Sequence, residues 1–118
     1  MRCLAILLAA ALPLCAADNA RFFDDRVAPI LEKRCLPCHN EELKNGNISF
    51  LDRASLLHGG PHGPAIVPGH PESSFLMIAL RHEGEIQMPP GPKLPSKEIS
   101  ILRKWIKQGA IWGSRLRK

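Results

Sequence analysis

Apolar residues recur at intervals of three or four after residue 20, and this spacing predicts an amphipathic helix that ends near Arg34. Pro29 falls inside the pattern. Because proline has no backbone N–H, we expect the helix either to start near Asp24 or Asp25 or to kink at the proline. The end of this helix then delivers Cys35. The apolar positions are Phe23, Val27, Ile30 and Leu31.

Three further helices are predicted downstream, each with a recognisable first residue. Asp52 suits an N-cap, Pro71 suits the first position of a helix, and Ser96 is the expected cap of the last helix. We expect these helices over residues 53–58, from 71 to about 82, and over 97–108. Their inward positions include Phe75, Leu76, Ala79 and Leu80 in the third helix, and Ile99, Leu102 and Ile106 in the last.

The chain of 118 residues has room for one domain, and it shows no internal repeat and no alternating strand pattern. Its 11 prolines and nine glycines indicate a large share of loop. The predicted fold is therefore small, mostly α and loop-rich, with about four short helices.

The first 17 residues have the pattern of a secretory signal peptide. A positive start at Met1-Arg2 precedes an apolar run from Leu4 to Leu14, and small residues follow up to Ala17. The run is too short to span a bilayer comfortably, although a retained anchor would leave the domain in the same compartment. Lipidation at Cys15 is disfavoured because Leu14 is large. We expect cleavage near Ala17 and a periplasmic or otherwise exported domain over residues 18–118.

Two cysteines remain after this cleavage, Cys35 and Cys38, and they are too close together to form a disulfide framework. With His39 they complete the Cys-x-x-Cys-His pattern of covalent haem attachment. Two thiols at this spacing can add to the two vinyl groups of one porphyrin, and the adjacent imidazole is placed to bind the iron. The sequence therefore predicts one covalently bound haem c.

Two other uses of these cysteines meet specific objections. A thioredoxin-like redox pair belongs to a βαβ pattern, which is missing here. A structural zinc site needs four ligands, usually in two spaced pairs. The remaining histidines that could complete one are scattered through predicted loops and helix ends; they are His58, His62, His70 and His82.

Met88 is the expected second axial ligand of the iron. It lies between Gln87 and Pro89-Pro90, in a loop that the prolines stiffen, so its thioether can be held in place. Met77 lies inside the predicted third helix, where filling the core is the ordinary role of a methionine. If Met88 does not bind, His62 and His82 are the next candidates. An open sixth position would instead indicate a haem-based enzyme or sensor.

Several stretches resemble the c-type cytochrome domain of the Planctomycetes type, itself similar to class I cytochromes c. The similarity extends over about residues 22–112. It implies a haem clasped by the first and last helices, with His39 and Met88 as axial ligands. Because no distal His-Arg arrangement for catalysis is readable in the sequence, we expect a one-electron carrier and not an enzyme. The most specific stretches are Cys35-Leu36-Pro37-Cys38-His39 and Gln87-Met88-Pro89-Pro90, supported by residues 27–31, 48–52, 59–60, 63–76, 93–94 and 105–110.

Charge is unevenly distributed along the expected mature chain. Residues 18–118 contain 15 Lys or Arg and 11 Asp or Glu, and from Lys93 onward eight basic residues meet one acidic residue, Glu98. Such a face speeds encounters with an acidic redox partner, although it is equally typical of a solvated helix with a basic tail. No nucleic-acid recognition motif accompanies it, and no stable membrane span is expected after cleavage.

Overall fold

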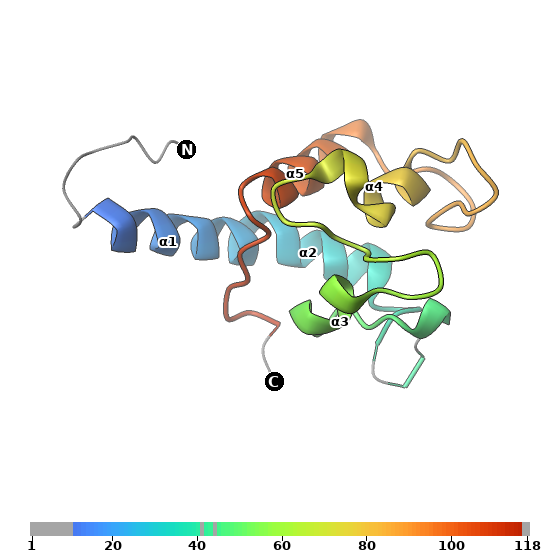
Figure 1. The fold of residues 1–118 in the computed structure, drawn as a ribbon, viewed down its shortest axis with the longest axis horizontal. Helices are drawn as coiled ribbons and strands as arrows, with labels where there is room; N and C mark the ends of the chain where they lie inside the picture. Colours follow the sequence, from blue (N-terminus) through green and yellow to red (C-terminus); the bar gives the residue numbers. More distant parts are fainter. Residues whose placement is uncertain (1–10, 41, 44, 117–118) are drawn as a thin grey trace.

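The computed structural model describes residues 11–40, 42–43 and 45–116. Its first third is one unbroken helical rod, drawn in blue to cyan in Figure 1. The rod consists of α1 (Ala11–Phe22), η1 (Phe23–Val27), α2 (Ala28–Ile30) and η2 (Leu31–Cys35). The helix therefore begins well before Asp24, the predicted start, and it continues through the proline.

Wider π turns lie on both sides of Pro29 within this rod. The amide of Ala28 donates to the carbonyl of Phe23, and the amide of Leu36 donates to the carbonyl of Leu31, so both bonds span five residues. Pro29 has no N–H for the turn before it, and its ring would press on the carbonyl four residues back. A local π turn takes up this mismatch without breaking the helix. The rod then ends at Cys35.

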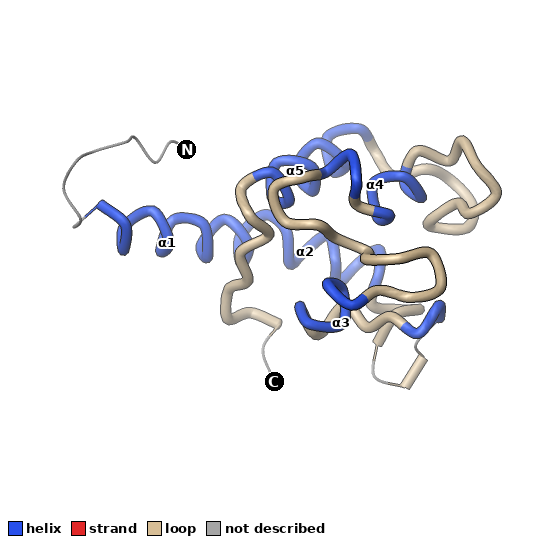
Figure 2. Tube along the Cα trace, viewed as in Figure 1, coloured by secondary structure: helices blue, strands red, loops and turns tan. Residues whose placement is uncertain are grey.

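The remainder of the described chain consists of short helices and loops, with no strand among the described residues (Figure 2). This confirms the predicted mostly α, loop-rich class. The elements are η3 (Asn45–Asn47), α3 (Arg53–His58), η4 (Pro71–Ser73), α4 (Phe75–Leu80) and α5 (Ser96–Lys107).

The helix predicted over residues 53–58 is correct, with the Asp52 side chain accepting a hydrogen bond from the amide of Ala54. The single helix predicted from Pro71 is wrong, because Ser74 has an extended backbone and divides it into η4 and α4. The hydroxyl of Ser74 donates to the His70 carbonyl at 3.0 Å and accepts from the Val67 amide at 2.9 Å. These local bonds compete with a continuous helix.

The last helix, α5, begins at Ser96, and Pro95 is its N-cap without a side-chain hydrogen bond, so the prediction of Ser96 as a cap is one residue out. Its inward stripe also differs from the predicted one. Trp105 is fully buried beside Leu102 and Ile106, whereas Ile99 is half-buried. The indole N–H of Trp105 donates to the Ile111 carbonyl at 2.9 Å, which satisfies its polar group.

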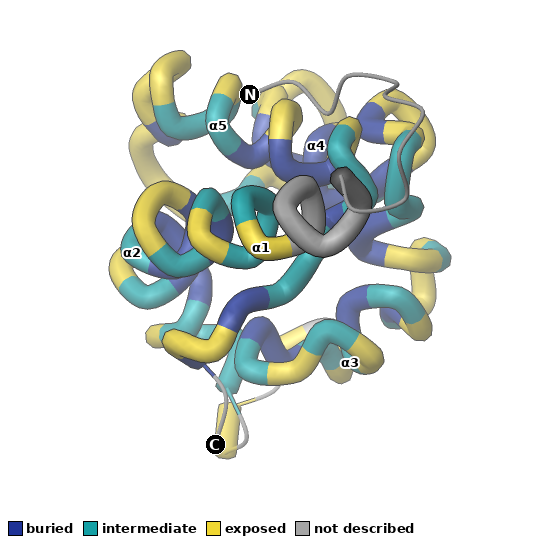
Figure 3. Tube along the Cα trace, turned by 90° about the vertical axis from the view of Figure 1, so that its left-hand side faces the viewer, coloured by how far each residue is buried: buried dark blue, intermediate teal, exposed yellow. Residues whose placement is uncertain are grey.

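An aromatic cluster joins the rod to α5 and the segment after it. The ring centroids of Phe23 and Trp112 are 4.3 Å apart, and those of Phe23 and Trp105 are 5.7 Å apart. Figure 3 shows the buried side of the rod facing the other helices, with its exposed side outward. The other fully buried side chains of this core include Leu31, Leu56, Ile66 and Met77.

Part of the predicted signal peptide, residues 1–10, lies outside the described residues, and the expected cleavage near Ala17 falls within α1. The cleavage and the division into residues 1–17 and 18–118 therefore stay predictions. Along the described part of the chain, no helix is both long and apolar enough to cross a membrane.

Candidate functional site

The Cys-x-x-Cys-His segment forms a compact turn directly after the rod. The amides of Cys38 and His39 both donate to the carbonyl of Cys35, at 3.1 and 2.9 Å. The side-chain amide of Asn40 donates to the Leu36 carbonyl at 2.7 Å and closes the turn. The end of a rigid helix thus fixes where the two thiols and the imidazole point.

The two thiols differ in exposure. Cys35 is buried and Cys38 is half-buried, and neither forms a disulfide. Burial raises the pKa of the Cys35 thiol to about 12, with the nearby Arg34 acting in the opposite direction. Cys35 is therefore a protonated thiol at neutral pH.

The orientation of His39 is set by a hydrogen bond that the sequence did not reveal. Its Nδ1 lies 3.3 Å from the carbonyl oxygen of Ile48, and because a carbonyl only accepts, Nδ1 must carry the proton. The Phe50 amide also donates to the His39 carbonyl at 2.8 Å. This arrangement leaves Nε2 with a free lone pair, which is the form of imidazole that binds a metal.

Met88 lies in a loop that hydrogen bonds hold at three points. The Met88 amide donates to the Ala79 carbonyl at 3.1 Å, and His82 Nε2 donates to the Met88 carbonyl at 3.0 Å. The side-chain amide of Gln87 donates to the carbonyls of His82 and Gly84, at 3.3 and 3.1 Å. Pro89 follows across a cis peptide bond. The loop is thus anchored to the end of α4.

Two adjoining cavities bring these residues together. The larger encloses about 700 Å³, including its open mouth, and the smaller about 450 Å³. His39, Phe50, Leu76 and Met88 line both, whereas Cys35 and Cys38 line only the smaller. His39 and Met88 come from distant parts of the sequence and reach the same hollow. The other residues that line it are mainly apolar, among them Ile48, Ala65, Phe75, Ala79, Leu80 and Leu94.

The end of the rod, α4 itself and the loops around α4 form the walls of this hollow, and no residue of α5 lines either cavity. The expected clasp between the first and last helices therefore does not describe this site. Instead, α5 packs behind η1 and α4, and its Glu98 accepts two hydrogen bonds from Arg34 at 2.9 and 3.2 Å. The hydrogen bond with Glu98 raises the pKa of Arg34.

The other candidate ligands occupy different positions. Met77 is buried in the core and lines neither cavity. His82 does not line them either, and its Nε2 is used by the Met88 carbonyl. His62 lines the larger cavity and stacks on Phe75. His58 and His70 are exposed away from both cavities.

The residues at the cavities fit a covalently attached haem. An apolar hollow suits the flat, apolar body of a porphyrin, and the two thiols at its edge suit bonds to carbon. His39 and Met88 supply an imidazole and a thioether, the two ligands expected of an electron-transfer haem. Among the described residues, no group of three or more His, Cys, Asp or Glu is arranged to hold a metal ion by itself.

Comparison with protein families places this domain among the c-type cytochromes. The family model that matches describes Planctomycete cytochrome C, and the match covers residues 35–92. The chain therefore carries a cytochrome c domain of the Planctomycete type, and this family implies covalently bound haem. No curated protein and no solved structure matches the chain significantly.

The family match begins at Cys35 and ends beyond the Met88 loop. It is shorter than the resemblance visible in the sequence, which extends from about residue 22 to 112. The rod and α5 lie outside the match, although they support the site from behind through the Arg34–Glu98 pair.

Proposed function

We propose that this protein is an exported carrier of single electrons that holds one haem c, bonded through Cys35 and Cys38. His39 and Met88 would hold its iron, through an imidazole nitrogen and a thioether sulfur. The observation that carries the proposal is that His39 and Met88, from distant segments, line the same apolar cavities with the cysteine pair at one edge. When bound, the haem supplies the Fe(II)/Fe(III) couple.

Backbone and side-chain groups of the protein act by holding and shielding this centre. Ile48 keeps the proton of His39 on Nδ1, and His82 restrains the loop of Met88. Phe50, Leu76 and Leu94 exclude water from the hollow, and a low-dielectric surrounding tunes the reduction potential.

The experiment that tests this function is a spectroelectrochemical titration of the purified, exported protein. We expect a reversible one-electron change per chain and a weak long-wavelength band in the oxidised form. This band should disappear in Met88→Ala, whereas Met77→Leu should keep it because Met77 lines neither cavity. An unchanged band in Met88→Ala, or carbon monoxide binding by the reduced wild type, would indicate an open or different sixth position.

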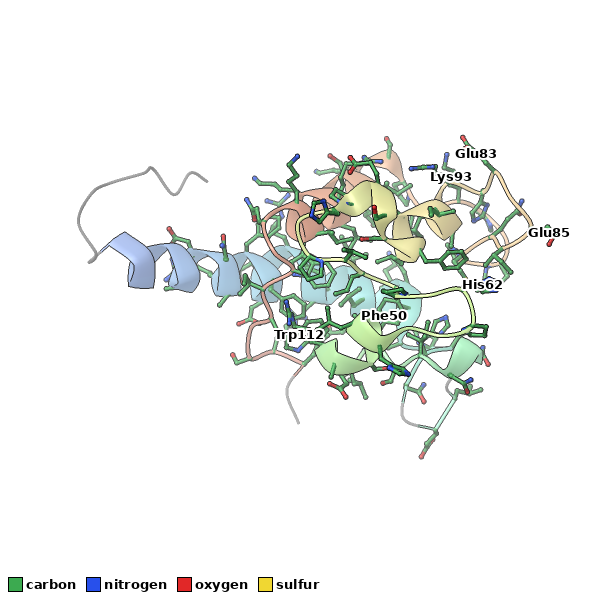
Figure 4. The ribbon with its side chains drawn as sticks, in the orientation of Figure 1. Phe50, His62, Glu83, Glu85, Lys93 and Trp112 are labelled. Atoms are coloured by element: carbon green, nitrogen blue, oxygen red, sulfur yellow. The ribbon has the colours of Figure 1, made fainter. Side chains whose placement is uncertain are left out.

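The partner of this carrier is a redox protein with an acidic docking face. Arg81, Lys93 and Arg103 surround a surface hollow that Leu94 also lines, and Leu94 lines the smaller cavity from its other side. Glu98 is paired with Arg34, so it does not offset the positive charge of these three residues. An acidic partner docked there would lie one side chain away from the cavity. Exposed Glu83 and Glu85 lie on the same loop as Lys93 (Figure 4), and neither lines this hollow.

This surface makes a prediction about rates. Oxidation by ferricyanide, an anionic probe, should slow with rising ionic strength, and Lys93→Glu with Arg103→Glu should lower the rate about tenfold at low salt. The control is Lys104→Glu with Lys107→Glu, which changes the net charge equally at two residues of α5 that do not line this hollow. Equal slowing in both variants would contradict a localised docking face.

A further inference from the structure

One peptide group behind His39 is hydrogen-bonded on both of its sides. The carbonyl oxygen of Ile48 accepts from Nδ1 of His39 at 3.3 Å, and the amide of the same peptide bond, which belongs to Ser49, donates to Oγ of Ser55 at 3.0 Å. Because a peptide group is planar and trans, its C=O and N–H point in opposite directions. A partner on each side therefore fixes the orientation of the carbonyl that faces His39.

The neighbouring peptide groups leave this one little freedom to turn. The Phe50 amide donates to the His39 carbonyl at 2.8 Å, and the Leu51 amide donates to Oγ of Ser49 at 3.2 Å. Three successive amides are therefore all hydrogen-bonded. Only 1% of the surface of Ser49 is exposed, so water has little access to replace the bond from its amide to Ser55.

Ser55 is carried by α3, and this short helix is itself anchored at two points. The guanidinium of Arg53 donates to the carbonyl of Ala110 at 2.8 Å, which ties the first turn of α3 to the segment after α5. The carbonyl of Leu56, a fully buried residue, accepts from the amide of Ala65 at 2.9 Å, and Ala65 lines the larger cavity. The hydroxyl of Ser55 therefore has a fixed place relative to the site.

The strength of the bond between Ile48 and His39 decides how basic the imidazole is. A partner that accepts the Nδ1 proton makes the imidazole a more basic ligand at Nε2. A hydrogen bond from the amide on the other side of the same peptide group polarises the carbonyl, which then accepts more strongly. Ser55 thus acts on His39 through a single peptide group, although Ser55 lines neither cavity.

We propose that Ser55 is a positioning residue for His39: its hydroxyl holds and polarises the peptide group between Ile48 and Ser49, and so lowers the reduction potential of the centre. This rests on the proposed function. A more basic imidazole stabilises the more positively charged Fe(III) state relative to Fe(II). Loss of the Ser55 hydroxyl weakens the hydrogen bond to Nδ1, so it should raise the potential.

The test is the midpoint potential of the haem-loaded protein, compared among variants at one pH. We expect Ser55→Ala to shift it in the positive direction, and Ser55→Thr, which keeps the hydroxyl, to stay near the wild type. The matched control is Ser74→Ala, because the Ser74 hydroxyl also accepts from a backbone amide, at 2.9 Å, while Ser74 lines neither cavity. This control should lower the melting temperature without moving the potential. An unchanged potential in Ser55→Ala, or an equal shift in Ser55→Thr or Ser74→Ala, would overturn the proposal.

Two NMR signals of the reduced protein report on the same contact. In the wild type the Ser49 amide should exchange slowly with solvent, and the Nδ1 proton of His39 should resonate farther downfield than in Ser55→Ala. A Ser49 amide that exchanges as fast in the wild type as in an unfolded chain would overturn the proposal, even if Ser55→Ala does not fold. A wild-type protein without covalent haem would contradict the proposed function itself, whereas a haem-loaded protein whose potential is indifferent to Ser55 would contradict this inference alone.

Discussion

At the scale of single residues, two hydrogen bonds from outside the Cys-x-x-Cys-His pattern prepare the proposed ligands. The Ile48 carbonyl fixes the tautomer of His39, and the His82 imidazole holds the backbone of Met88. Neither partner could be predicted from the sequence, because both contacts depend on how loops fold back. The sequence did single out His39 and Met88, and both line the same cavities; their role as ligands stays a prediction.

His82 offers a direct test at this scale. Its Nε2 donates to the Met88 carbonyl at 3.0 Å, and His82→Ala removes this bond, which contributes about 1 kcal/mol in a typical case. We expect a weaker long-wavelength band and a lower melting temperature. His82→Gln, which keeps an N–H donor, should largely restore the band. If His82→Ala behaved like His58→Ala, a variant of an exposed residue at the end of α3, His82 would have no positioning role.

At the scale of elements, the short helix α3 and the class of the fold were predictable, because Asp52 and the glycines after residue 58 act locally. The boundaries of longer elements were not. Ser74 divides the helix predicted from Pro71 through contacts with His70 and Val67, and π turns carry the rod through Pro29. Both outcomes depend on hydrogen bonds that apolar spacing does not record.

The C-terminal segment is tied to the rod by Asp24. Its carboxylate accepts hydrogen bonds from the amides of Arg115 at 2.9 Å and Ser114 at 3.3 Å, and Arg115 also pairs with Glu32. Burial acts to raise the pKa of Asp24, but these hydrogen bonds outweigh it and hold the pKa below the ordinary value of 3.8.

This contact predicts a pH dependence. Because the pKa of Asp24 is lowered in the folded state, its ionised carboxylate contributes to the free energy of unfolding above pH 3.8. This contribution is lost as the pH falls through the pKa of Asp24 in the folded protein. Acid should therefore release the C-terminal segment. The release would be seen at residues 114–116 as faster amide hydrogen exchange relative to an unfolded chain at the same pH. Asp24→Asn should already show this faster exchange at neutral pH, and Asp25→Asn serves as the control. Equal exchange in both variants would contradict the role of Asp24.

At the scale of the whole molecule, the apolar hollow beside α4 separates the rod from the Met88 loop. Apolar side chains that surround a cavity of this size lack packing partners on one side, so their burial contributes little to the free energy of unfolding. We therefore expect Cys35→Ala with Cys38→Ala, which prevents covalent attachment, to leave the chain largely unfolded. Circular dichroism and thermal melting check this, and a native-like spectrum with an unchanged melting curve would show that the chain folds by itself. Met77→Leu, a core change of similar volume, is the control for general destabilisation.

Covalent haem at Cys35 and Cys38 is the claim on which the proposed carrier depends most directly. The decisive measurement is a pyridine haemochrome spectrum of the exported protein after extraction with acidified acetone, which removes haem that is not covalently bound. We predict that the colour stays with the polypeptide, with the spectrum of a haem bonded through two thioethers, and that it is lost in Cys35→Ala with Cys38→Ala. A colourless polypeptide after extraction of the wild type would contradict the account.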